Sequence, residues 1–235
     1  MKHKKLLTAA AIALSLSVFV FLMMRSTGKI TQTAMIDPAE RKTRVIIDPG
    51  HGGEDGGAVV GNILEKNINL DISQDTADLL RLMGFDVSMT RSNDNALTDE
   101  GEDVKKRKYN DMRLRLSMYN SSPDNVIISI HQNKFSNASS KGAQVFYSPN
   151  NDLSTRLAES IRLSTVSQLQ PDNSRECKAA GKEIYLLKNT DNPAVIVECG
   201  FLSNSQERQK LLDTEYQKQL ALAVATGFLD YYNNN

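Results

Sequence analysis

Three apolar runs of this chain each end at a residue that can bind a metal ion or transfer a proton. The runs and the residues after them are Val45–Ile47 before His51, Val126–Ile130 before His131, and Pro193–Val197 before Glu198. Short runs rich in β-branched residues favour buried strands. The carboxyl ends of strands in an open α/β sheet meet at one edge, where ligands bind. We therefore expect His51, His131 and Glu198 to lie close together.

Glu65 is a fourth candidate. The stretch Asn62-Ile63-Leu64-Glu65 predicts a helix start, with Asn62 as the N-cap and Glu65 at the capping-box position. A capping glutamate needs no catalytic role. However, Glu65 also lies three residues before Ile68 and seven before Ile72, which places it on the inward stripe of the helix. Spacing alone leaves Glu65 as either a helix cap or a metal ligand.

Two histidines and a carboxylate around an open position are typical of catalytic zinc, which keeps three protein ligands and one water. Zinc lowers the pKa of that water to about 7 and polarises a carbonyl. A carboxylate that does not bind the metal can pass the water's proton to a leaving amine. His51, Glu65 and His131 as ligands, with Glu198 as the acid/base, would make an amide hydrolase. The spacing equally permits Glu65 and Glu198 to exchange roles.

The elements that position these residues alternate along the chain. Expected strands cover 44–48, 85–90, 126–130, 142–147, 183–187 and 193–198, and expected helices cover 62–84, 107–119, 153–170 and two further segments up to residue 231. This order predicts an α/β single domain with a mostly parallel twisted sheet and helices on both faces. We expect the Lys and Arg residues of 107–119 to form a solvated face, with contact to an anionic substrate group as the alternative. Strand alternation should turn Cys199 away from Glu198 and into the core, which argues against a catalytic cysteine.

The N-terminus differs from the rest of the chain. Lys2, Lys4 and Lys5 precede the apolar run Leu6–Met24, and Arg25 closes it. Residues 1–25 are therefore expected to be a signal peptide or a signal-anchor transmembrane helix, and the lack of a small-x-small cleavage site favours the anchor. The polar residues 26–43 form the expected linker, and 44–235 the catalytic domain. Basic residues before the run keep the N-terminus cytoplasmic, so the domain should be extracytoplasmic.

Composition excludes several classes of protein. The chain has 28 acidic and 28 basic residues, and it has no basic surplus that would indicate nucleic-acid binding. Two cysteines are too few for a disulfide scaffold. With 40% apolar residues, the chain can bury a sizeable core.

Four motifs resemble the zinc-dependent N-acetylmuramoyl-L-alanine amidases of bacterial cell walls (the amidase-3 family). They are Asp48–Gly53, Glu65-Lys66, Ser129–Asn133 and Val197–Asn204, and the resemblance covers about residues 44–231. It implies hydrolysis, in peptidoglycan, of the amide between the lactyl group of N-acetylmuramic acid and the L-alanine of the stem peptide. It also implies that His51, Glu65 and His131 bind Zn²⁺ and that Glu198 is catalytic. The domain 44–235 would then be a zinc amidase domain, either anchored to the membrane or secreted to the cell wall.

Other stretches resemble the sporulation-specific branch, whose enzymes remove stem peptides so that cortex muramic acid can become δ-lactam. They are Arg107-Lys108, Asp111, Arg113, Gly142–Tyr147 and Tyr185–Lys188. Gln132 departs from the family, which usually has a small or apolar residue there, and the Arg-Gly pair common elsewhere is missing around Arg175. Residues 147–184 leave room for one helix only, so the long inhibitory insertion of partner-activated relatives should be absent and the site open. The sequence leaves open whether zinc loading requires a lipoprotein activator.

Two other functions fit the same spacing. One is a non-catalytic peptidoglycan-binding module, which would typically have lost a ligand or the acid/base glutamate. The other is a different zinc hydrolase of the cell wall, such as a carboxypeptidase or a sugar deacetylase. The presence of all four candidate residues argues against a non-catalytic binding module. The residues of the four motifs argue against another class of zinc hydrolase.

Overall fold

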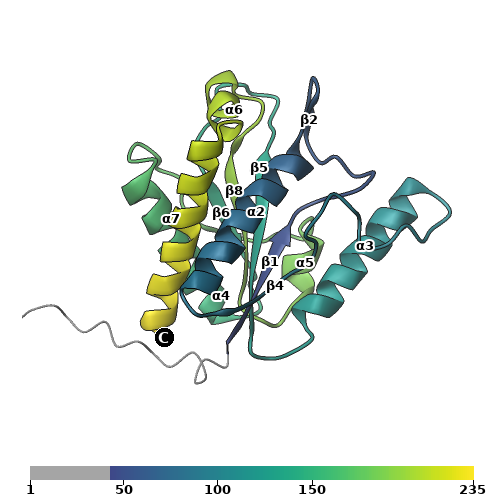
Figure 1. Ribbon diagram of the computed structural model, residues 1–235, viewed down its shortest axis with the longest axis horizontal. Helices are drawn as coiled ribbons and strands as arrows, with labels where there is room; N and C mark the ends of the chain where they lie inside the picture. The colour runs from purple at the N-terminus through teal and green to yellow at the C-terminus, as the bar shows by residue number, and fades with distance from the viewer. Residues whose placement is uncertain (1–42) are drawn as a thin grey trace, which may run out of the picture. The chain divides into compact units, whose positions relative to one another are not determined.

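A six-stranded sheet forms the centre of the computed structural model, which describes residues 43–235 (Figure 1). The strands lie in the order β4-β1-β5-β8-β6-β7. Their bounds are β1 Arg44–Pro49, β4 Asp86–Met89, β5 Asn125–Asn133, β6 Gln144–Tyr147, β7 Lys178–Ala179 and β8 Ala194–Phe201. Neighbouring strands are parallel except β6 and β8, which are antiparallel. The predicted mostly parallel α/β sheet is confirmed.

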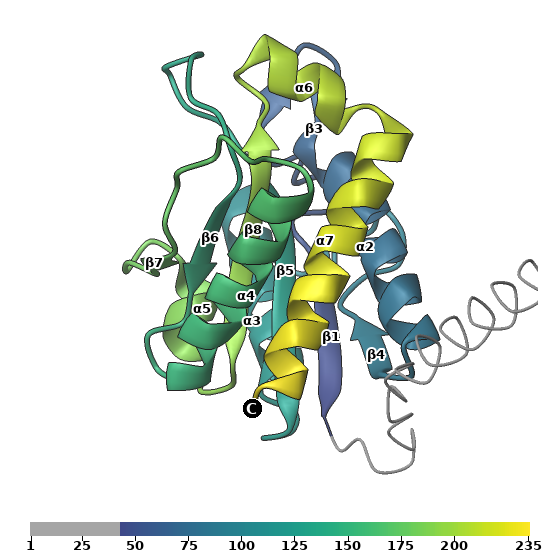
Figure 2. The same cartoon turned by 90° about the vertical axis from the view of Figure 1, so that its left-hand side faces the viewer.

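Helices cover both faces of the sheet. Figure 2 shows α2 (Glu65–Leu82), α4 (Asp152–Gln168) and α7 (Thr214–Asn233) in front of it, with α3 (Val104–Tyr119) and α5 (Tyr185–Asn189) behind. The short helix α6 (Ser205–Leu211) joins β8 to α7. A small hairpin of β2 (Val59–Val60) and β3 (Ile63–Leu64) precedes α2. The single helix α4 between β6 and the loop before α5 confirms that this stretch has no long helical insertion.

Strand alternation divides the core into two clusters. Val45 and Ile47 of β1 belong to the larger cluster, which packs under α2, α4 and α7. Ile46, between them, belongs to the smaller cluster under α3 and α5. Cys199 is buried in the larger cluster, whereas Glu198 lines a cleft on the α3 side of the sheet. The expected opposite orientation of these two neighbours is confirmed.

Two local predictions are wrong. Residues 183–187 do not form a strand, because the chain from Tyr185 is helix α5 and the place at the sheet edge is taken by β7. Short apolar runs fit a buried strand and a buried helical turn equally well, and here Leu186 and Leu187 pack in the smaller cluster. Asn62 is not the N-cap of α2 either. The helix begins at Glu65 after Leu64, and no side chain caps it.

The predicted signal peptide or anchor at 1–25, and nearly all of the linker 26–43, lie outside the described residues. No helix within residues 43–235 is both long and apolar enough to cross a membrane.

Candidate active site

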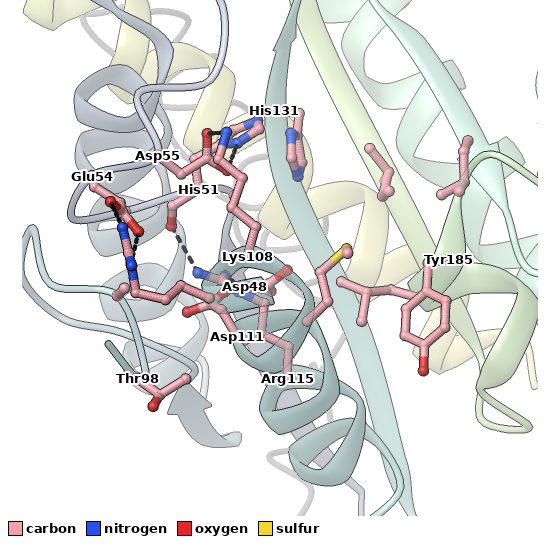
Figure 3. Close-up of a pocket in the computed structure, with 18 of the residues that line it drawn as sticks. Asp48, His51, Glu54, Asp55, Thr98, Lys108, Asp111, Arg115, His131 and Tyr185 are labelled. Atoms are coloured by element: carbon pink, nitrogen blue, oxygen red, sulfur yellow. Dashed lines mark hydrogen bonds and ion pairs between the residues drawn. The ribbon is translucent and has the colours of Figure 1, made fainter. Parts of the chain in front are cut away.

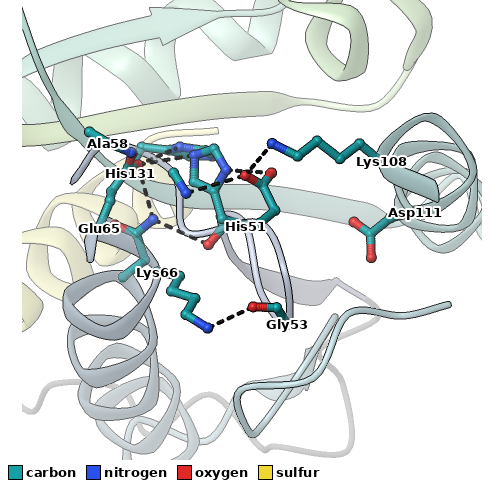
Figure 4. A network of polar contacts seen from close by, with 12 residues as sticks. His51, Gly53, Ala58, Glu65, Lys66, Lys108, Asp111 and His131 are labelled. Carbon is teal, nitrogen blue, oxygen red and sulfur yellow. Dashed lines mark hydrogen bonds and ion pairs between the residues drawn. The ribbon is translucent and has the colours of Figure 1, made fainter. Parts of the chain in front are cut away.

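Two histidines and a glutamate converge at the carboxyl end of the sheet. His51 lies in the loop after β1, Glu65 is the first residue of α2, and His131 lies near the end of β5. One donor atom from each side chain lies within 4.8 Å of the other two. Oε1 of Glu65 is 3.3 Å from Nε2 of His51 and 3.0 Å from Nδ1 of His131 (Figure 4). The structure therefore brings together three of the four predicted residues in a donor set that suits a single cation.

The loop after β1 is shaped to allow this approach. His51 has a φ of 63°, a conformation that residues other than glycine rarely adopt. Gly50 leaves room for the second imidazole, since a Cβ at this position would lie 2.2 Å from atoms of the His131 ring. The loop is held from α3, where Arg115 donates from Nη2 to the carbonyl of His51 at 2.7 Å and from Nη1 to the carbonyl of Pro49 at 2.9 Å.

A buried ion pair fixes α3 against β1. Asp48 is fully buried and pairs with Arg115, which also binds Asp111 at 2.6 Å (Figure 3). Burial raises the pKa of Asp48, but the charge of Arg115 and hydrogen bonds from Thr90, Tyr119 and Ser129 outweigh it and hold that pKa far below 3.8. The prediction that the basic residues of 107–119 form a solvated face is therefore wrong for Arg115.

Glu65 is buried but well supplied with donors. Its Oε1 accepts hydrogen bonds from Asn69 Nδ2 at 3.1 Å and from the backbone N–H of Gln132 at 3.0 Å, and its Oε2 accepts from the N–H of Ala58 at 2.7 Å (Figure 4). Burial raises the pKa of this carboxyl, but the two histidines outweigh it and bring the pKa well below 4.5. Glu65 is therefore a carboxylate at neutral pH, as a metal ligand must be.

Asp55 is a further residue of the site, beyond the four predicted from the sequence. Its Oδ2 lies 2.8 Å from Nδ1 of His51, which turns Nε2 of that ring toward Glu65. Its Oδ1 accepts from Nζ of Lys108 on α3 at 2.7 Å. Burial lowers the pKa of His51, but hydrogen bonds with Asp55 and Glu65 raise it to about 9, so the site attracts positive charge. A carboxylate behind a histidine ligand is a common support of metal sites. In the sequence, the position of Asp55 four residues after His51 is the feature that could have indicated this supporting role.

Glu198 lies opposite His131 in the register of β5 and β8. Burial raises its pKa to about 7. Its Oε2 is buried and has no hydrogen-bond partner among residues 43–235. A carboxyl group with a pKa near 7 can both accept and donate a proton at neutral pH, which is the property required of a general acid/base. Glu198 therefore has a pKa that suits proton transfer, and it lies opposite the ligand candidate His131.

A cleft of about 370 Å³ on the α3 side of the sheet is lined by His51, Asp55, His131 and Glu198 (Figure 3). One wall is charged and comes from the β1–β2 loop and α3, with Glu54, Asp55, Arg107 and Lys108. The other wall is largely apolar and comes from α3, β8 and the chain around α5, with Met112, Ile184, Tyr185, Leu186 and Ile196. The cleft has room for a substrate with both charged and apolar parts next to Glu198.

Comparison with known proteins agrees with this geometry. Residues 45–230 match the family described as N-acetylmuramoyl-L-alanine amidase. The germination-specific N-acetylmuramoyl-L-alanine amidase of Bacillus subtilis is 35% identical over 189 residues, which are 80% of this chain and 79% of that protein. The CwlD amidase of Clostridioides difficile, solved in complex with the GerS lipoprotein, superposes with a TM-score of 0.79 at 34% identity, covering 82% of this chain and 100% of that one.

An N-acetylmuramoyl-L-alanine amidase from Clostridium difficile 630 superposes with a TM-score of 0.70 at 28% identity, over 83% of this chain and 99% of that chain. The family match spans most of the residues that the structure describes, including all four predicted site residues. The chain belongs to the N-acetylmuramoyl-L-alanine amidase family of peptidoglycan hydrolases.

Proposed function

We propose that the protein hydrolyses the amide between N-acetylmuramic acid and L-alanine with a zinc ion held by His51, Glu65 and His131, and with Glu198 as general acid/base. One observation carries the proposal: three donor atoms, one from each of His51, Glu65 and His131, lie within 4.8 Å of one another. Next to them is the buried Oε2 of Glu198, which has no hydrogen-bond partner among residues 43–235. Two imidazoles and one carboxylate, with a fourth position left for water, suit zinc.

When bound, zinc would supply a Lewis acid that lowers the pKa of water and polarises the scissile carbonyl. Asp55 holds His51 through Nδ1 and leaves Nε2 free for the metal. Glu198 takes a proton from the attacking water and passes it to the nitrogen of the leaving L-alanine. Because its pKa lies at about 7, both transfers are accessible at neutral pH. The charged and apolar walls of the cleft position the substrate.

Mass spectrometry of purified peptidoglycan, incubated with the zinc-loaded full chain, tests the reaction. The expected products are peptides that begin with L-alanine, together with glycan that carries unsubstituted muramic acid. Cleavage at another bond would assign the protein to a different class of hydrolase. Zinc binding without any cleavage, even when membrane extracts are added to supply an activator, would indicate a binding module.

We further propose a role in the spore cortex, where removal of stem peptides would allow muramic acid to become δ-lactam, and an extracytoplasmic lipoprotein as activating partner. The support is similarity to the germination-specific amidase of B. subtilis and to the CwlD amidase solved with a lipoprotein. Deletion of the gene in its own organism should then remove muramic δ-lactam from cortex digests. A normal δ-lactam content would contradict the cortex role and leave the amidase reaction itself standing.

A further inference from the structure

Gln132 is a buried amide behind the metal-binding candidates. It follows His131 in β5, so its side chain points to the opposite face of the sheet, toward α2 and the larger core cluster. Only 3% of Gln132 is exposed. Its Nε2 donates to Oδ1 of Asn69 at 3.3 Å. A glutamine at this place is surrounded mostly by apolar core.

Asn69 connects Gln132 to the candidate ligand Glu65. It is fully buried on α2, one turn after Glu65. Its Nδ2 donates to Oε1 of Glu65 at 3.1 Å and to the carbonyl of Gly50 at 3.2 Å. Two side-chain amides therefore form a chain of hydrogen bonds that runs from the core to the carboxylate oxygen nearest both histidines.

The direction of the Asn69 amide matters for Glu65. If the amide turned by 180°, Oδ1 would face the Glu65 carboxylate and the Gly50 carbonyl, so that three acceptors would meet with no hydrogen between them. The donor Nε2 of Gln132 favours the observed orientation, because it binds Oδ1 on the far side of Asn69. The same orientation gives the carboxylate of Glu65 a hydrogen bond that holds it in place.

We infer that Gln132 is a positioning residue, which acts through Asn69 to hold Glu65 in its metal-binding orientation; this inference rests on the proposed function. The structure also shows what Gln132 costs the fold. Its Oε1 is buried and has no hydrogen-bond partner among residues 43–235. A buried unpartnered acceptor destabilises a protein. An apolar side chain of similar size would remove this acceptor but would take away the donor to the buried Oδ1 of Asn69. These two effects on stability oppose each other, so zinc affinity is the quantity that reports the role of Gln132.

Zinc affinity separates a positioning role of Gln132 from a purely structural one. In the full chain, Gln132→Leu should weaken zinc binding about tenfold, as is common when a supporting group of a metal site is lost. The melting temperature of the metal-free protein should change little, because Oδ1 of Asn69 replaces Oε1 of Gln132 as a buried acceptor without a donor. Zinc affinity is measured by competition with a chromophoric chelator, and melting by circular dichroism in chelator. Gln132→Met is a second variant in case the branched leucine packs poorly.

A double-mutant cycle tests whether the effect passes through Asn69. Asn69→Ala should weaken zinc binding by itself, and adding Gln132→Leu should then change zinc affinity by less than twofold. Gln217→Leu is the matched control, since Gln217 is a buried glutamine of α7 whose Nε2 donates to the carbonyl of Leu211 at 2.7 Å. It should lower the melting temperature and leave zinc affinity unchanged.

The outcomes separate this inference from the proposed function. A wild-type chain that does not bind zinc would overturn the ligand set and this inference with it. Zinc binding by the wild-type chain with unchanged affinity in Gln132→Leu would overturn the inference and leave the proposed function standing. Additive losses in Asn69→Ala and Gln132→Leu would show that Gln132 does not act through Asn69.

Discussion

At the scale of single residues, the surroundings of Glu198 and Glu65 shift the pKa values of the two carboxyl groups in opposite directions. Burial raises the pKa of Glu198, whereas the histidines around Glu65 outweigh the same effect and lower its pKa. Two carboxyl groups that both interact with His51 and His131 thereby differ: Glu65 is a permanent carboxylate, and Glu198 can exchange protons. This difference supports Glu65 as the ligand and Glu198 as the acid/base, which residue spacing alone left interchangeable.

Glu198→Gln should fold and bind zinc normally but lose nearly all turnover, by at least about 10²-fold, because the amide cannot exchange the proton. Parallel measurements of zinc affinity and peptide release check this. Loss of zinc from this variant would mean that Glu198 is a ligand. As a comparison, His51→Ala should lose zinc and activity together.

The raised pKa of Glu198 also predicts how stability depends on pH. Below pH 4.5 the Glu198 carboxyl is protonated in both the folded and the unfolded chain, so its burial does not lower the free energy of unfolding. As the pH rises from 4.5 through about 7, only the unfolded chain ionises freely, so the metal-free folded state loses up to about 3 kcal/mol. In chelator, Glu198→Gln should therefore exceed the wild type in unfolding free energy at pH 8 and match it at pH 4. An equal difference at both pH values would contradict the assigned pKa.

At the scale of elements, the β1–β2 loop is built for the approach of two imidazoles. Gly50→Ala should keep the fold and lose zinc binding, since its Cβ would lie 2.2 Å from the His131 ring. Gly61→Ala is the control: Gly61 has a φ of 59° and nothing within 4 Å of an added Cβ. That change should cost roughly 1 kcal/mol of stability through backbone strain alone. Zinc titration and urea unfolding of both variants make the comparison.

The contact between α3 and β1 is an equally specific prediction. Arg115→Met should destabilise the protein by about 3–5 kcal/mol, because it leaves Asp48 buried and charged. The double variant Asp48→Asn/Arg115→Met should recover part of this loss. Arg81→Met, which removes an exposed ion pair with Asp78, should cost less than about 1 kcal/mol. Urea unfolding at pH 7 measures the free energy of unfolding of all three variants. Equal losses in Arg115→Met and Arg81→Met would show that the buried pair is no more important for stability than an exposed one.

Acid should weaken the same contact. The pKa of Asp48 is far below 3.8 in the folded protein, so its stabilising effect is complete above pH 4 and is lost as the pH falls toward the folded value. The wild type should therefore lose unfolding free energy below pH 4 more steeply than Asp48→Asn/Arg115→Met does. Urea unfolding of the two proteins, repeated at several pH values below 7, measures this difference.

At the scale of the whole molecule, the domain has its candidate site at the carboxyl ends of β1, β5 and β8, whereas the chain enters at Arg44, at the other end of β1. If residues 1–25 are an uncleaved anchor, removing them should shift the protein from the membrane fraction to the soluble fraction. Peptide release from isolated peptidoglycan should then persist, because the site residues all lie beyond residue 43. If expression of the full chain gives only protein in the culture medium that has lost residues 1–25, the segment is a cleaved signal peptide.

The sequence determined the family, the set of candidate site residues and the general architecture. Runs such as Val126–Ile130 are local signals for buried strands, and the order of such runs and helices restricts the topology to a mostly parallel α/β sheet. Because these strands end at the same edge, His51, His131 and Glu198 could be placed together without coordinates. Alternation along β8 was also enough to turn Cys199 away from the site.

Only the tertiary structure decided how the site is supported. Asp48 and Arg115 are 67 residues apart in the chain, and the ion pair between them could not be read from a helix whose other basic residues are mostly exposed. The apolar run at 183–187 fits strand and helix alike until its packing is known. Likewise, the side chain of Gln132 reaches Glu65 through Asn69 on another element, whereas its backbone N–H binds Glu65 directly. Residue type and local period are encoded along the chain, but partners across elements depend on how those elements pack.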